Sequence, residues 1–128
     1  MPTDPASIPL SLEYSFEQDV QFEFTIAHYD PKLPPVLSTP AMIGLMETAA
    51  ARAVAPHLAP GEITVGTRIE VDHLKASLPG ARVRYWARLE GVDGRFLIFS
   101  VTAHEGEKQI GRGRVFRAIV DLTRHGSR

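Results

Sequence analysis

One helix-forming segment, preceded by a single alternating segment and followed by four more, is the feature that most limits the possible folds. Residues 40–57 are rich in Ala, Leu and Met, which are good helix formers. Thr39 is a preferred N-cap residue type, and Pro40 suits the first helical position, so we expect the helix to start here. A helix of this length spans about 27 Å, which is enough to cross a small domain.

The segments around this helix alternate apolar and polar residues, which is the pattern of strands with one buried face. They cover residues 14–27, 62–75, 82–92, 95–105 and 108–121. Asp93-Gly94 is a strong hairpin signal, and three prolines in residues 28–37 predict a loop before the helix. We therefore predict an α+β domain with an antiparallel sheet wrapped around one long central helix, which is the hot-dog fold. Because so small a sheet leaves an exposed edge, we also expect a homodimer.

Length and composition place the chain among single-domain globular proteins. Its 128 residues fit one domain, which we assign to residues 14–122, between a flexible Pro-rich segment (1–13) and a flexible tail (123–128). The formal net charge of -1 argues against a nucleic-acid partner, and the absence of Cys excludes thiolate metal sites and Cys nucleophiles. The five His residues lack metal-ligand spacing, so we predict no metal. We see neither a signal peptide nor an apolar run of about 20 residues, so we expect a cytoplasmic protein with no membrane partner.

Glu47 stands out on the predicted helix because it interrupts an apolar face. Ile43, Ala50 and Val54 lie on the same side of the helix at spacings of three and four residues. Burying an unpaired carboxylate is costly. Glu47 is therefore either solvated, or paired with Arg52 or another basic residue in a structural ion pair, or a functional carboxylate.

Thr39 lies two helical turns before Glu47 on the same face, and His73 lies on the strand predicted for residues 62–75. Strict alternation along that strand puts Gly66 on the face opposite to Val65, Thr67, Ile69, Val71 and His73. An inward histidine is more often a core residue, but it titrates where acid–base catalysis needs it. Glycine inside a strand favours a bulge or a close approach by another group.

Three arginines near the end of the chain are a weaker signal. Arg112, Arg114 and Arg117 could contact phosphates, although charged strand residues usually form a solvated face.

The order of the short motifs is more specific than any one of them. Val36-Leu37-Ser38-Thr39-Pro40-Ala41-Met42, Leu45-Met46-Glu47, Val65-Gly66-Thr67 and Val71-x-His73-Leu74 together resemble the fluoroacetyl-CoA thioesterase family of hot-dog proteins. The resemblance continues through Val92-Asp93-Gly94-Arg95 and Ile110-Gly111-x-Gly113 and covers roughly residues 17–121. It implies a homodimeric, metal-free thioesterase with active sites at the subunit interface and with Thr39, Glu47 and His73 as catalytic residues.

The same resemblance implies a small acyl-CoA substrate, with no separate cofactor because coenzyme A is part of the substrate. Gly66, Leu33, Val36 and Ile43 are the substrate-binding residues that we expect. Residues 28–35 contain no Phe, so we do not extend the prediction to fluoroacetyl selectivity. An acyl-CoA hydratase or dehydratase, whose Asp/His pair in one short segment is not evident here, and a non-catalytic acyl-CoA-binding protein remain alternatives.

Overall fold

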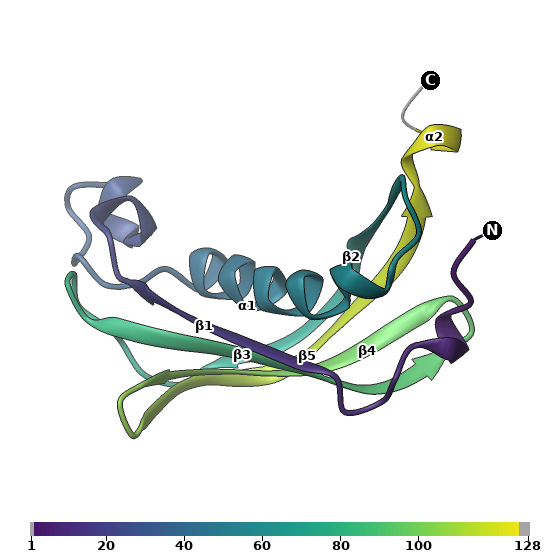
Figure 1. The fold of residues 1–128 in the computed structure, drawn as a ribbon. Helices are drawn as coiled ribbons and strands as arrows, with labels where there is room; N and C mark the ends of the chain where they lie inside the picture. Colours follow the sequence, from purple (N-terminus) through teal and green to yellow (C-terminus); the bar gives the residue numbers. More distant parts are fainter. Residues whose placement is uncertain (1, 126–128) are drawn as a thin grey trace.

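The computed structural model describes residues 2–125 and contains one antiparallel sheet with one long helix on its concave face (Figure 1). The strands are β1 (Glu13–Asp19), β2 (Glu62–His73), β3 (Arg82–Asp93), β4 (Phe96–Glu105) and β5 (Lys108–Asp121), in the spatial order β1-β3-β4-β5-β2. The helix is α1 (Thr39–Val54), and a short helix, α2 (Leu122–His125), follows the last strand. The predicted α+β hot-dog architecture is confirmed.

The core lies between α1 and the central strands. Buried residues of α1 follow its apolar face: Met42, Met46, Ala49, Ala50, Ala53 and Val54. They pack against the alternating buried residues of β3, which are Val83, Tyr85, Ala87 and Leu89. The small alanines let the helix lie close to the sheet, which fixes both ends of α1 relative to the strands.

The predicted first strand is too long. β1 ends at Asp19, and two 3₁₀ turns follow, Phe22–Phe24 and Ile26–His28. The backbone N–H of Val20 bonds to the Ala81 carbonyl at 2.8 Å, and the buried Thr25 hydroxyl donates to the Phe22 carbonyl at 2.7 Å. A local side-chain hydrogen bond of this kind competes with a strand ladder, so the chain turns away from the sheet although apolar residues still alternate in the sequence.

The N-terminal segment contacts the domain. Ile8 is only 4% exposed and belongs to the core, and Thr3 donates hydrogen bonds from its amide and hydroxyl groups to Glu62. The Pro-rich composition of residues 1–13 does not indicate these contacts. The flexibility of this segment stays a prediction. Of the predicted tail, residues 126–128 lie outside the described residues.

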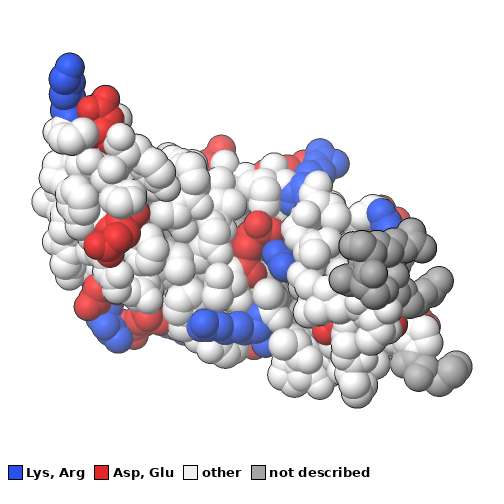
Figure 2. All heavy atoms as spheres, turned by 90° about the horizontal axis from the view of Figure 1, so that it is seen from above, with Lys and Arg blue, Asp and Glu red and all other residues white. Residues whose placement is uncertain are grey.

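The face of the molecule that carries α1 is largely uncharged, with acidic and basic side chains scattered across it (Figure 2). Within the described chain, no helix combines the length and the apolar character needed to span a membrane.

Candidate active site

The hydroxyl of Thr39 is available for contacts outside α1 because the neighbouring residue, and not Thr39, caps the helix. Ser38, not Thr39, is the N-cap: its hydroxyl accepts a hydrogen bond from the Ala41 N–H at 3.1 Å. Thr39 is the first residue of α1, and Pro40 lies in the first turn, where its missing N–H costs no intrahelical bond. The prediction that Thr39 caps the helix was wrong, because Ser and Thr are both preferred caps and the sequence offers them side by side.

A β-bulge in β2 decides which residues face the helix. The pairing register with β5 shifts between Gly66 and Arg68, so Thr67 is an extra residue in β2. A Cβ on Gly66 would collide with Glu47 of α1, and Gly111, which pairs with His73, faces the α1 methionines in the same way. Gly66 and His73 therefore share the inner face. The predicted grouping of His73 with Val65, opposite to Gly66, was wrong, since the extra residue inverts the alternation.

Thr39 and His73 form one half of the candidate site. The Thr39 hydroxyl lies 2.7 Å from Nδ1 of His73. Burial lowers the pKa of His73, an effect that a nearby backbone group of Lys75 partly opposes. A neutral imidazole can accept the hydroxyl proton at Nδ1, which is the relation between a nucleophile and its base.

An apolar cavity of about 300 Å³ borders this pair. It is lined by Thr39 and His73, by Lys75, and by the apolar residues Ile26, Val36, Leu37, Leu74 and Ala76. A polar hydrogen-bonded pair beside an apolar wall can hold a small acyl group next to a reactive hydroxyl.

Glu47 belongs to a second cavity of about 350 Å³, bordered by Thr64, Gly66 and Arg117. The Arg117 guanidinium donates to Glu47 Oε1 at 2.9 Å, and to the hydroxyl and carbonyl oxygens of Thr64 at 2.8 Å each. The Arg117 side chain is 9% exposed and that of Glu47 27%. Burial lowers the pKa of Arg117, and the nearby Glu47 carboxylate opposes this effect.

The sequence-based prediction for Arg117 was a possible phosphate contact, and it did not identify Glu47 as the ion-pair partner of this residue. A signal was present, because Val115, Arg117 and Ile119 alternate along β5 and the two neighbours are apolar. Arg117 thus interrupts the apolar face of a strand as Glu47 interrupts that of the helix. Arg114 instead points outward and pairs with Glu70.

The two halves are separate within one chain. Eight residues of helix divide Thr39 from Glu47, which is about 12 Å along the helix axis. Of the predicted substrate-binding residues, Val36 lines the first cavity and Gly66 the second, whereas Leu33 and Ile43 line neither. Within residues 2–125, no group of three or more His, Asp or Glu side chains is arranged to hold a metal ion.

The five-stranded antiparallel sheet with one long helix is the architecture of solved hot-dog thioesterase structures. The chain aligns with FlK, a fluoroacetyl-CoA thioesterase of known structure, with a TM-score of 0.87 and 36% identity over 94% of both chains. A thioesterase superfamily member from Thermus thermophilus aligns with a TM-score of 0.85 and 34% identity over 94% of this chain and 89% of its own.

The family follows from the sequence comparisons. The model of the fluoroacetyl-CoA-specific thioesterase family matches residues 20–123. The fluoroacetyl-CoA thioesterase of Streptantibioticus cattleyicolor is 41% identical over an alignment of 110 residues, and the match covers 81% of this chain and 79% of that protein. The chain belongs to the fluoroacetyl-CoA-specific thioesterase family and is a thioester hydrolase.

Proposed function

We propose that this thioesterase hydrolyses a small acyl-CoA to the free acid and coenzyme A. The observation that carries the proposal is the Thr39 hydroxyl, 2.7 Å from the His73 imidazole and beside an apolar cavity. Family membership and the relatives' acyl-CoA chemistry support the same reaction. The reaction needs no cofactor besides the coenzyme A of the substrate, and we propose a cytoplasmic location.

Two routes of attack on the thioester carbonyl fit these residues. In the first, Glu47 attacks directly or removes a proton from a water molecule. In the second, Thr39 attacks after giving its proton to His73, the imidazole returns the proton to the leaving thiolate, and water then hydrolyses the Thr39 ester to release the free acid. Both routes create an oxyanion that needs a hydrogen-bond donor.

The start of α1 limits where that donor can come from. The N–H groups of Ala41 and Met42 already bond to Ser38, and Pro40 has none. The Thr39 N–H has no hydrogen-bond partner among the described residues, so we propose it, or the N–H of Gly66, as the oxyanion donor.

We propose that a homodimer completes the site along β2. This strand pairs only with β5 within the described chain, and its Ile63, Val65 and Ile69 are each about 40% exposed. Both cavities border β2, through His73 in one and Gly66 in the other. Pairing of β2 with β2 of a second copy would therefore bring both cavities to the interface.

The test is thiol release from a panel of acyl-CoAs by the wild-type protein, Glu47→Gln and the control Glu90→Gln. Glu90 is an exposed carboxylate on β3, so its amide should leave turnover unchanged. Loss of a catalytic carboxylate should lower turnover about 100- to 10,000-fold. Wild-type turnover without free thiol, for example formation of a double bond, would refute the hydrolase assignment. Near-normal hydrolysis by Glu47→Gln would remove Glu47 from the mechanism.

A further inference from the structure

The outer face of the sheet, away from α1, carries a cavity that the thioesterase reaction does not use. Strand register places Arg84 opposite His104 and Trp86 opposite Thr102, with Arg112 beyond Thr102 on β5. Arg84, Trp86, Thr102, His104 and Gly106 line a hollow of about 350 Å³. Because the whole sheet separates it from α1, this hollow is distinct from the Thr39 and Glu47 cavities (Figure 1).

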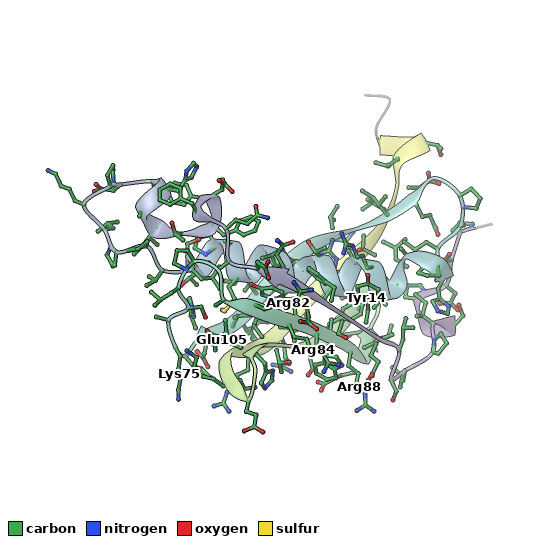
Figure 3. All side chains as sticks on the ribbon, turned by 60° about the vertical axis from the view of Figure 1, so that its left-hand side comes forward. Tyr14, Lys75, Arg82, Arg84, Arg88 and Glu105 are labelled. Atoms are coloured by element: carbon green, nitrogen blue, oxygen red, sulfur yellow. The ribbon has the colours of Figure 1, made fainter. Side chains whose placement is uncertain are left out.

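Arg84 lines this hollow, and Arg88 and Arg112 lie outside its lining, on β3 and β5; none of the three has a carboxylate partner within ion-pair distance among the described residues. Arg84 donates to the Ser15 hydroxyl at 3.3 Å and Arg88 to the Ser11 hydroxyl at 2.9 Å, while Arg112 has no ion pair or side-chain hydrogen bond in residues 2–125. In Figure 3, Arg84 and Arg88 lie along the outer side of the sheet.

The acidic residues of this face are mostly occupied elsewhere. Glu17 and Asp19 pair with Arg82, Glu70 pairs with Arg68 and Arg114, and Glu105 pairs with Lys108. Glu13 and Asp72 lie opposite Arg88 and Arg112 in the strand register but form no ion pair with them. Glu13 and Asp72 therefore offset part of the charge of Arg88 and Arg112, whereas Arg84, which lines the hollow, has its side-chain hydrogen bond to the Ser15 hydroxyl and no ion pair among the described residues.

Trp86 gives the hollow an aromatic surface. Its side chain is half-buried, and its cross-strand neighbours Ser15 and Thr102 are small. No ring or cation–π contact involves the indole within the described chain, and Trp86 is part of the lining of the hollow. Arg84 lies two residues along the strand, about 7 Å away, and Arg112 two strands away, about 10 Å, both within reach of the phosphates of a ligand stacked on the indole.

We propose that this hollow binds a phosphorylated adenosine, with the base stacked on Trp86 and the phosphate oxygens held by Arg84 and Arg112. Guanidinium groups bind phosphate oxygens in a bidentate manner, and aromatic side chains stack on nucleobases. The ligand is either a free adenine nucleotide or the nucleotide end of coenzyme A. Because the hollow lies behind the sheet, it is a second site and not part of the path to the thioester.

Trp86 is the only tryptophan in the chain, so its fluorescence reports on this hollow alone. The full-length protein is titrated with ADP, with coenzyme A and with pantetheine, which lacks the nucleotide. We expect saturable quenching by ADP and coenzyme A and none by pantetheine. If coenzyme A binds and ADP does not, the hollow requires the 3′-phosphate that only coenzyme A carries, and coenzyme A is the ligand. Equal binding of the two shows that the hollow recognises the adenosine diphosphate that they share.

Matched variants locate the binding. Arg84→Ala and Arg112→Ala should each weaken ADP binding about tenfold or more, since each removes a phosphate contact. Arg95→Ala, which removes a guanidinium from the β3–β4 turn, should bind as the wild type does. Because binding is measured directly, the result does not depend on whether any acyl-CoA is hydrolysed.

Three results would overturn the proposal. The first is unchanged fluorescence with millimolar ADP and coenzyme A, and the second is quenching that survives in both arginine variants. The third is a fluorescence change on dilution of the protein without ligand, which would identify this face as a contact between copies of the chain.

Discussion

Gly66→Ala tests whether the position of the Glu47 carboxylate matters for catalysis. A Cβ at residue 66 would overlap Glu47 Oε1 and would lie 3.1 Å from its Cδ and Oε2 atoms. The carboxylate must then move by on the order of 1 Å, a displacement that can cost about 100-fold in rate when a catalytic group is misplaced. The same movement weakens the 2.9 Å bond from the buried Arg117, so we expect a loss of about 1–3 kcal/mol in the free energy of unfolding.

The assay compares thiol release and thermal unfolding for Gly66→Ala and for Gly91→Ala. Gly91 is also a strand glycine next to a bulge, but a Cβ there would meet only Ile98 Cδ1, at 4.0 Å. This control should keep its activity, so it isolates the contact with Glu47 from the general effect of replacing a strand glycine. Wild-type turnover by Gly66→Ala, with the expected loss of stability, would show that the carboxylate is displaced without consequence and would refute the reasoning.

Four further predictions concern the two halves of the site and the edge of the sheet. Thr39→Val should lower turnover about 100-fold while Thr39→Ser keeps most of it, because only the valine removes the hydroxyl that contacts His73; equal losses measured by thiol release would contradict this. Burial lowers the His73 pKa below its usual 6.5, so as the pH falls from 6.5 toward the folded-state pKa the unfolded chain binds more protons than the folded one, and stability decreases. In His73→Gln the thermal stability should decrease less steeply over this pH range. An unchanged slope would contradict this prediction. Arg117→Lys cannot keep all three bonds to Glu47 and Thr64 and should lower the free energy of unfolding by about 2–3 kcal/mol in denaturant titrations. Val65→Lys places a charge on the open edge of β2 and should shift sedimentation toward a monomer, whereas Leu78→Lys, the same kind of change at a loop residue that is 63% exposed, should not.

The architecture was predictable because its signals are local and repeated. Asp93-Gly94 sets the β3–β4 hairpin, and alternation along β3 and β4 matches their buried residues. The end of β1 was not predictable in this way, since the alternation of Val20, Phe22 and Phe24 continues beyond Asp19 while the backbone turns into 3₁₀ geometry. Phe22 is 52% exposed and Thr25 is buried, so the apolar alternation matches the observed burial only as far as Val20, and backbone hydrogen bonding decides where the strand ends.

The bulge at Thr67 shows a different limit. A count by twos from His73 reaches Val65, but the inserted residue makes Gly66 the one that faces α1. The sequence shows Gly66 as an anomaly without showing on which side of it the extra residue lies. One unpaired residue therefore exchanges the inner and outer faces of half a strand, and with them the residues assigned to the site.

Arg117 and Glu47 show how two anomalies become informative when they are considered together. Each is a charge within an apolar stripe, and either one alone would be expensive to bury and is most simply interpreted as a solvated residue. Their pairing, with Thr64 accepting the remaining guanidinium bonds, removes that cost and also orients the carboxylate toward Gly66. Charges of opposite sign on the inward faces of two different elements are a pattern that the amino-acid sequence alone contains, and it points to this pair. The Thr39–His73 pair lacks such a signature, because Thr is common at a helix start and a lone His is common in a core, so only the ordered motifs of the family link them.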